Sequence, residues 1–321
     1  MNNTVSAVQA GGPEVLHYAA ADMPTPGPGQ LLIKVQAIGL NFIETYQRNG
    51  NYKVSYPFVP GSEAAGTIEA LGEGVEGFEV GQRVATAEGE GCYANFAVLD
   101  ASRALPIPDG LDIETAAALP LQGMTAHYLI NSSFRVEPGQ TVLIHAGAGG
   151  VGLLIIQLLK ARGARVFTTV SSPEKADLAR SAGADEVLEY KDFAARVREL
   201  TDGVGTDVVY DGVGKDTFDG SLASLRTRGT LVLFGAASGP VPPLDPQRLN
   251  AGGSLSLTRP TLRDFLLTPQ ERRWRSEEIF AAAASGQLAV RIGARYALKD
   301  AGKAHADLEG RKTTGKVILI P

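Results

Sequence analysis

The chain has 321 residues, of which 44% are hydrophobic and 20% charged, which is typical of a globular protein long enough for two hydrophobic cores. Its formal net charge of -5 argues against a nucleic-acid-binding surface, because a phosphate backbone selects for clustered Lys and Arg. Cys92 is the only cysteine, which excludes an internal disulfide framework and fits a reducing compartment. We find neither a signal-peptide pattern nor a membrane span, and so expect a cytoplasmic protein.

The first part of the chain, residues 1–124, has the pattern of a compact β-rich unit. Short segments rich in β-branched residues occur at 31–40, 64–72 and 82–86. Clusters of Gly and Pro, such as 24–30, separate them and predict turns. We therefore expect several short strands that share one core.

Residues 141–163 predict the strand, turn and helix of a dinucleotide-binding unit. Gly147, Gly149 and Gly152 fit the G-x-G-x-x-G spacing, and they stand between an apolar strand and an apolar helix. Glycines allow a tight turn and let a pyrophosphate approach the backbone, and the N–H groups and dipole of the helix start then hold its negative charge. The pattern on its own is weak evidence, but its framing by strand and helix makes it strong.

From about residue 125 onward, strand and helix patterns alternate. Such alternation predicts an open parallel sheet with helices on both faces, and the nearly continuous apolar runs suit strands that are buried on both sides. The six strand candidates are 141–146, 164–170, 186–190, 207–212, 230–235 and 254–258, and the helix patterns are 150–162, 173–182, 192–201, 216–227 and 244–251.

The last part of the chain departs from this alternation. Residues 261–288 have the pattern of a helix pair. A basic stretch follows, and then a terminal strand at 316–321. This part is too short for a core of its own, so we expect it to rejoin the N-terminal unit. The predicted fold is an α/β Rossmann-type doubly wound sheet at 125–262, inserted in a β-rich catalytic domain made of 1–124 and the return segment 263–321.

The end of the second predicted sheet strand favours NADP over NAD. A fold built for NAD has Asp or Glu there to bind the ribose 2′-hydroxyl, whereas this chain has Ser171 and Ser172, followed by Lys175. A hydroxyl-lined site with a nearby cation suits a 2′-phosphate. Ser172 also fits a helix N-cap and Lys175 a solvated surface position. Tyr190 either flanks the ribose phosphate or is a half-buried strand residue.

The sequence resembles the zinc-independent quinone oxidoreductases of the medium-chain dehydrogenase/reductase superfamily, the group that contains zeta-crystallin. The likeness runs nearly end to end, and GGPEVL at 11–16, GLNFIETYQRNGNY at 39–52 and AGAGGVG at 146–152 carry it most specifically. The resemblance implies an NADPH-dependent homodimer with a GroES-like catalytic domain and a Rossmann-type domain. The strand at 254–258 could pair edge to edge across the two-fold axis of such a dimer.

The resemblance also implies roles for individual residues. It places Asn41, Tyr46 and Tyr52 in a cleft beside the nicotinamide. Each also has a structural interpretation, since the tyrosines could be packing aromatics and Asn41 could cap a turn. Arg311 matches a basic position that can reach the 2′-phosphate, or it belongs to a solvated loop with Lys312 and Lys316. The remaining implied cofactor contacts are Thr125, Gly149, Gly150, Val151, Ser172, Lys175, Tyr190, Gly214, Phe234, Leu257 and Thr258.

A catalytic zinc ion is not expected. Such a site needs about three protein ligands, and Ser62 stands where a zinc-binding relative has His in Gly-His-Glu. The four histidines His17, His127, His145 and His305 show no ligand spacing, and we interpret His145 as a core histidine. Without a Lewis acid, the substrate must accept hydride readily by itself.

These features predict hydride transfer from NADPH to a quinone. Asn41 would donate a hydrogen bond to the carbonyl that gains negative charge, and Tyr46 would orient the acceptor and could deliver a proton. Reduction of α,β-unsaturated ketones, aldehydes or acyl-thioesters is an alternative that the sequence does not separate from quinone reduction. A non-enzymatic RNA-binding or structural role and a zinc alcohol dehydrogenase are further alternatives.

Overall fold

The computed structural model describes all 321 residues, and they form two compact units. Unit 1 consists of Met1–Met124 and Thr268–Pro321, and unit 2 of Thr125–Leu267. The second division lies after Leu267, whereas the sequence suggested residue 262. The aromatic ring of Phe265 stacks on that of Tyr128 with 4.4 Å between ring centroids, which gives this segment a packing partner in unit 2.

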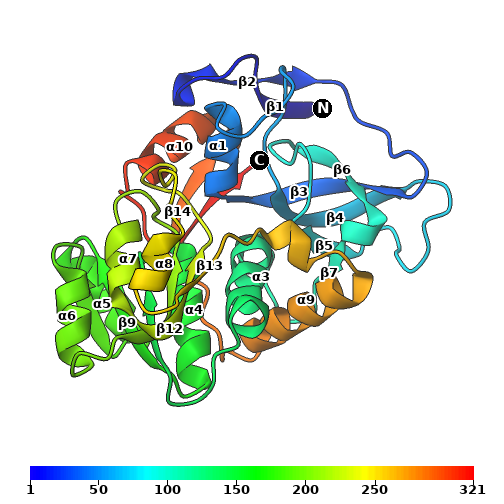
Figure 1. Ribbon diagram of the computed structural model, residues 1–321. Coiled ribbons are helices and arrows are strands. Elements are labelled where there is room, and N and C mark those ends of the chain that lie inside the picture. The colour runs from blue at the N-terminus through cyan, green and yellow to red at the C-terminus, as the bar shows by residue number, and fades with distance from the viewer. The chain divides into compact units, whose positions relative to one another are not determined.

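Unit 1 is built on a seven-stranded sheet with the order β14-β15-β3-β4-β5-β7, in which β6 pairs with β3 (Figure 1). The last strand β15 runs antiparallel to β3, with Leu319 opposite Ile38. The return segment therefore completes the N-terminal unit, as expected. The sheet strands are β3 (Gln30–Leu40), β4 (Glu63–Leu71), β5 (Arg83–Thr86), β6 (Phe96–Asp100), β7 (Leu105–Pro106), β14 (Ile292–Ala297) and β15 (Lys316–Ile320).

Strand β3 forms the centre of the unit 1 core, because it pairs with β4, β6 and β15. Its apolar residues Leu31, Ile33 and Ile38 are fully buried, and they pack in one cluster with residues of β4 and β15. The other elements are the hairpin of β1 (Asn2–Ala7) and β2 (Leu16–Ala21) and the helices α1 (Phe42–Arg48), α2 (Ile113–Ala118), α9 (Pro269–Ala284) and α10 (Ala301–Glu309). Helix α3 (Pro120–Tyr128) spans the division between the units.

Unit 2 contains a six-stranded sheet with the order β10-β9-β8-β11-β12-β13, and every pair in it is parallel. This is the strand order of a Rossmann-type fold, and all six strand candidates are confirmed. The strands are β8 (Thr141–Ile144), β9 (Arg165–Val170), β10 (Glu186–Glu189), β11 (Thr206–Asp211), β12 (Leu225–Leu233) and β13 (Ser256–Thr258). The helices are α4 (Gly150–Ala161), α5 (Pro173–Ser181), α6 (Phe193–Leu200), α7 (Phe218–Ser224) and α8 (Gln247–Ala251), drawn in green to yellow in Figure 1.

Two sequence predictions need correction. The helix expected at 216–227 ends at Ser224, because β12 already begins at Leu225 and its first residue pairs with Thr206 of β11. The helix pair expected at 261–288 is one short 3-10 helix, Leu262–Phe265, followed by the single long helix α9. Thr268 and Glu271 form a capping box at the start of α9, and Pro occupies its first turn, so the chain must begin a new helix there.

No helix of the structure is both long and apolar enough to cross a lipid bilayer.

Candidate active site

The glycine turn between β8 and α4 uses its three glycines for different purposes. A Cβ atom on Gly147 would lie 2.2 Å from Oγ1 of Thr168, and one on Gly152 would lie 2.3 Å from the backbone oxygen of Ala146. Packing within unit 2 therefore requires these two glycines. A Cβ on Gly149 would have a single neighbour within 4 Å, the backbone oxygen of Ala146, which would lie 3.2 Å away. The middle glycine thus leaves the backbone open to a ligand, as a pyrophosphate requires.

Helix α4 begins directly at this turn. Its N-cap is Gly149, which has no side chain to cap the helix, and Gly150 and Val151 form the start of the first turn. The first backbone N–H groups of a helix have no acceptors within the helix, and its dipole favours negative charge at this end. The turn and the helix start therefore fit the diphosphate of a dinucleotide.

Ser171, Ser172 and Lys175 lie together beyond the end of β9. The hydroxyl of Ser172 accepts a bond from the backbone N–H of Lys175 at 3.4 Å and so caps α5. The ammonium group of Lys175 donates to the hydroxyl of Ser171 at 3.3 Å. One cation and two hydroxyls therefore gather where an NAD-binding fold has a carboxylate, a donor set that suits a 2′-phosphate. Tyr190 follows β10, and its ring lies parallel to that of His145 at 6.2 Å.

Gly214 and Phe234 belong to two loops that are bonded to each other. Both loops start at the carboxyl ends of neighbouring parallel strands, β11 and β12. The backbone N–H of Phe234 donates to the backbone oxygen of Asp211 at 2.8 Å. Gly214 has a φ of +89°, and a Cβ there would lie 2.8 Å from the oxygen of Gly239. Leu257 and Thr258 lie one strand further, on β13 beside β12. Thr125 is a buried residue of α3.

In unit 1, Asn41 is buried and its side-chain amide is fully bonded within the protein. The amide nitrogen donates to Oε2 of Glu63 at 2.8 Å and to the backbone oxygen of Gly39 at 3.3 Å, and the amide oxygen accepts from Nζ of Lys316 at 2.6 Å. In the hydride-transfer mechanism expected from the sequence, this amide donates to the substrate carbonyl. That role needs correction for the arrangement seen here, because both amide protons already have protein acceptors.

The partners of Asn41 form a buried ionic cluster. The ammonium group of Lys316 also donates to Glu63, whose other carboxylate oxygen accepts the backbone N–H of Leu121 at 2.7 Å. Glu44 accepts the backbone N–H groups of Asn41 and Ser62 at 2.8 and 3.0 Å. Burial raises the pKa of the Glu44 carboxyl to about 7, although its hydrogen bonds and Lys316 act in the opposite direction. Lys316, which the sequence grouped with a basic loop, is 1% exposed.

Tyr46 and Tyr52 lie side by side in unit 1. Their ring centroids are 5.3 Å apart, and the backbone N–H of Tyr52 donates to the backbone oxygen of Tyr46 at 2.9 Å. Tyr52 is 43% exposed, so this pair presents aromatic surface to solvent. Arg311 has a φ of +57° and lies in the turn after α10. The structure thus groups the three predicted catalytic residues and Arg311 in unit 1 and the other predicted cofactor residues in unit 2.

No group of three or more His, Cys, Asp or Glu side chains is arranged to hold a metal ion. Cys92 is buried, and its thiol has a pKa raised to about 12. Burial is the main cause, and the carboxylates of Glu44 and Glu63 raise the pKa further.

Known proteins resemble the chain over its whole length. Residues 27–109 match the alcohol dehydrogenase GroES-like domain, and residues 150–277 match the zinc-binding dehydrogenase family. A quinone oxidoreductase of Pseudomonas aeruginosa is 46% identical over 315 residues, which cover 97% of both chains. The chain belongs to the quinone oxidoreductase family. A 2-haloacrylate reductase of a Burkholderia species is 39% identical, over 97% of this chain and 96% of its own. A mycobacterial protein solved in complex with NADPH superposes with a TM-score of 0.97 at 53% identity, over the full length of both chains.

As a member of the quinone oxidoreductase family, the chain is an oxidoreductase of the medium-chain dehydrogenase/reductase superfamily. Four of its buried polar residues were not predicted from the sequence: Glu44, Glu63, Asp211 and Lys316. Glu44 lay within residues 39–52, which carried the resemblance, whereas the other three stand beside or within the apolar runs at 64–72, 207–212 and 316–321. An ionisable residue next to such a run was the available signal, because a buried charge needs a partner. His145 is 2% exposed and both ring nitrogens are bonded, so its interpretation as a core histidine is confirmed.

Proposed function

We propose that this protein reduces quinones with NADPH and does so without a metal ion. The observation that carries the proposal is the glycine turn, whose middle glycine is open while the two outer ones are held by packing. Family membership and the NADPH complex of a neighbour that is 53% identical support the same cofactor. When bound, NADPH supplies the hydride.

The residues of unit 2 bind the cofactor in this proposal. Gly149, Gly150 and Val151 bind the diphosphate with backbone N–H groups, and Ser171, Ser172 and Lys175 bind the 2′-phosphate. The loops that hold Gly214 and Phe234 lie at the carboxyl ends of the parallel strands, where open α/β sheets bind their ligands, and they hold the nicotinamide half. Leu257, Thr258 and Thr125 contribute contacts, and Tyr190 completes the adenosine end within unit 2. For Arg311 of unit 1, only the family resemblance supports a contact with the 2′-phosphate.

The residues of unit 1 orient the acceptor. Tyr46 and Tyr52, whose ring planes are tilted by 53° to each other, offer aromatic surface against which a quinone ring can pack. Asn41 acts as a positioning residue, since its amide joins the start of α1 to Glu63 and Lys316. A quinone accepts hydride readily, because its reduction product is aromatic, so no Lewis acid is needed. The proton that completes the hydroquinone comes from solvent or from the Tyr46 hydroxyl.

Reduction of an α,β-unsaturated carbonyl compound is the second candidate. It is favoured by one observation, the 39% identity to a 2-haloacrylate reductase over 97% of the chain. The two activities share the cofactor and differ only in the acceptor that fits beside Tyr46 and Tyr52.

A panel of acceptors tests the proposal. The purified protein is mixed with NADPH and either 1,4-benzoquinone, an enone, 2-chloroacrylate or crotonyl-CoA, and oxidation of NADPH is followed by its loss of absorbance. Turnover should be fastest with benzoquinone and should survive a chelator, with no zinc in elemental analysis. Turnover of only the enone, 2-chloroacrylate or crotonyl-CoA would favour the second candidate. Tight NADPH binding without quinone turnover would contradict the first.

The 2′-phosphate site has its own test. The variant Lys175→Met should weaken NADPH binding about tenfold and leave NADH binding unchanged, because one charge-assisted contact is lost. Lys299→Met is the matched control, since Lys299 is an exposed lysine of unit 1. Equal affinity of the wild-type protein for NADH and NADPH would contradict the choice of cofactor.

We further propose a cytoplasmic homodimer. Strand β13 is an edge strand of the unit 2 sheet and can pair with its copy across a two-fold axis. Light scattering of the purified protein should give twice the mass of the chain.

A further inference from the structure

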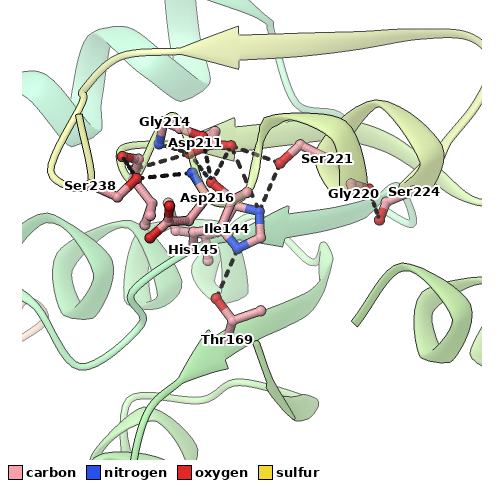
Figure 2. A network of polar contacts seen from close by, with 12 residues as sticks. Ile144, His145, Thr169, Asp211, Gly214, Asp216, Gly220, Ser221, Ser224 and Ser238 are labelled. Atoms are coloured by element: carbon pink, nitrogen blue, oxygen red, sulfur yellow. Dashed lines mark hydrogen bonds and ion pairs between the residues drawn. The ribbon is translucent and has the colours of Figure 1, made fainter. Parts of the chain in front are cut away.

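A buried chain of hydrogen bonds in unit 2 takes no direct part in the proposed function. It starts at Asp211, the last residue of β11, which is fully buried. One carboxylate oxygen accepts the backbone N–H groups of Val213 and Gly214, each at 2.9 Å. The other accepts the hydroxyl of Ser221 at 2.7 Å, and the Thr217 hydroxyl lies within 2.9 Å of both oxygens. Asp211 thus folds the loop that follows it back onto its own side chain (Figure 2).

The protons of this chain can be assigned from chemistry. A carboxylate only accepts hydrogen bonds, so the single proton of the Ser221 hydroxyl goes to Asp211. Nε2 of His145, 2.9 Å from the Ser221 oxygen, must therefore be the donor of that bond. Nδ1 is then unprotonated and accepts the Thr169 hydroxyl at 2.8 Å. The neutral ring agrees with burial, which lowers the pKa of His145 to about 4 against the opposing effect of Asp211.

The far end of the chain reaches the glycine turn. The backbone oxygen of Thr169 accepts the N–H of Gly147 at 3.1 Å. A continuous series of bonds therefore joins the phosphate-binding turn, through Thr169, His145, Ser221 and Asp211, to the loop that holds Gly214. Each bond has a fixed direction, so loss of one member leaves its neighbours without a partner inside a dry core.

The loop at 212–217 in turn supports the loop after β12. The hydroxyl of Ser238 donates to the backbone oxygen of Val213 at 2.8 Å and accepts the N–H of Asp216 at 3.0 Å. The N–H of Ala237 donates to the oxygen of Gly212 at 3.1 Å. The two loops assigned to the nicotinamide half of the cofactor are thus held as one body, and Asp211 is its anchor in the sheet.

We propose that Asp211, itself held by Ser221 and His145, is a positioning residue that holds the loop at 212–217 in its cofactor-binding conformation. The proposal rests on the proposed NADPH function. Asp211, Ser221 and His145 bond to one another and act on the cofactor site only through the loop. The proposal requires the chain of hydrogen bonds to affect the nicotinamide half of the site and to leave the adenosine end, with Ser172 and Lys175, undisturbed.

The test compares two ligands and three variants. NADPH occupies both ends of the site, whereas 2′,5′-ADP occupies the adenosine end and, with its 5′-phosphate, one phosphate position at the glycine turn, and leaves the nicotinamide half empty. The variants are Asp211→Asn, which turns an acceptor into a donor, and Ser221→Ala, which removes the middle of the chain. Ser224→Ala is the matched control, because Ser224 is a buried serine of the same helix α7 and its hydroxyl donates only to Gly220 of that helix (Figure 2). Thermal unfolding without ligand shows which variants are folded.

The dissociation constant for NADPH should rise about tenfold or more in Asp211→Asn and Ser221→Ala, the factor expected for losing one buried hydrogen bond in the bound state. The constant for 2′,5′-ADP should change by less than about twofold, and Ser224→Ala should match the wild type with both ligands. The KM for NADPH should rise with the dissociation constant, while kcat at saturating NADPH stays within about threefold of the wild type.

Three outcomes would overturn the positioning role. The first is unchanged NADPH affinity in both variants, and the second is an equal loss of affinity for NADPH and 2′,5′-ADP, which indicates general damage to unit 2. The third is a loss of NADPH affinity in Ser224→Ala as large as in Ser221→Ala. If the wild-type protein itself does not bind NADPH, the proposed function fails along with the positioning role. If it binds and the variants bind equally well, only the positioning role fails.

Discussion

The two units bury carboxylates in different ways. Unit 1 places cations against two carboxylates: Glu63 lies against Lys316, and the half-buried Glu309 accepts two bonds from the buried guanidinium of Arg48 at 2.8 and 3.0 Å. The third, the buried Glu44, accepts the backbone N–H groups of Asn41 and Ser62. Unit 2 buries Asp211 among neutral donors only, two backbone N–H groups and two hydroxyls. The buried polar residues of unit 2 include no Lys or Arg at all.

The difference determines how each network fails. A buried ion pair has a large desolvation cost on both sides, and removal of one partner leaves an isolated charge in the core. A carboxylate held by several neutral donors loses only one hydrogen bond when a donor is removed. We therefore expect single substitutions to be more damaging in the ionic cluster of unit 1 than in the hydroxyl network of unit 2.

The largest effect is expected from Lys316→Met. The substitution keeps the length of the side chain but leaves Glu63, which is fully buried, without its cation. The free energy of unfolding should fall by about 3 to 5 kcal/mol, measured by urea denaturation.

Lys312→Met is the control for that substitution, because Lys312 is exposed and pairs with Asp307 at the surface. It should change the free energy of unfolding by less than about 0.5 kcal/mol. A loss in Lys316→Met no larger than in this control would show that the ionic cluster contributes little. The double variant Lys316→Met/Glu63→Gln should recover part of the loss, because it removes the isolated charge.

The next effect concerns pH, to which Glu44 and His145 contribute with opposite signs. Glu44 has a pKa raised to about 7 in the fold against 4.5 in the unfolded chain, so the fold gains stability relative to the unfolded chain as the pH falls from 7 to 4.5. His145, with a pKa lowered to about 4, acts in the opposite direction: its contribution is complete above pH 6.5 and declines as the pH falls toward 4.

The variant Glu44→Gln should therefore be more sensitive to acid than the wild type. Between pH 7 and 4.5, its free energy of unfolding should fall by up to about 3 kcal/mol more than that of the wild type. Urea denaturation at a series of pH values measures the difference, in which titrations common to both proteins cancel. Parallel curves for the two proteins would mean that Glu44 does not take up a proton in this range.

A smaller effect is expected in unit 2. Ser221→Ala removes one donor to Asp211 and the acceptor of the His145 ring, and should lower the free energy of unfolding by about 1 to 3 kcal/mol. The loss in Ser224→Ala should be smaller, because that hydroxyl bonds only within its own helix. A loss in Ser221→Ala above that of Lys316→Met would reverse the comparison between the two networks.

The smallest effect is expected at the surface of unit 2, where its cations lie. Lys160 pairs with Asp185 at 2.8 Å, and both side chains are about one-third exposed. Lys160→Met should cost less than about 1 kcal/mol, and the cost should shrink further in high salt. Thermal unfolding at low and high ionic strength measures both.

The elements of unit 2 were predictable because its strands are short apolar runs flanked by glycine and polar turns. The glycine turn was recognisable for the same reason, since Gly147, Gly149 and Gly152 stand between such a run and an apolar helix. Strand β12 was only partly predictable: residues 225–229 include two arginines, and only Leu225 among them pairs with β11, before the pairing is interrupted and resumes at Thr230. Strand β14 was missed because its six residues, IGARYA, include a glycine and an arginine and form no continuous apolar run.

The polar networks were beyond local sequence analysis. Glu63 and Lys316 are 253 residues apart, and only the register of β15 on β3 brings the ammonium group to the carboxylate. His145 directly follows β8, and Ser221 lies on α7, the helix after β11. They meet because β8 and β11 are neighbours in the sheet. The sequence placed Asn41 near the cleft through family resemblance alone, and could not show that its amide is engaged by two ionic partners.

The pairing of β15 with β3 also sets the order in which the molecule is completed during its synthesis. Residues 316–320 are synthesised after β3 and after all of unit 2, yet they fill the place beside β3. Unit 2 is contiguous and can fold while translation continues, whereas the N-terminal sheet waits with an unpaired edge and an uncompensated glutamate. A nascent chain stopped before residue 316 would thus lack both strand β15 and the cation that pairs with Glu63.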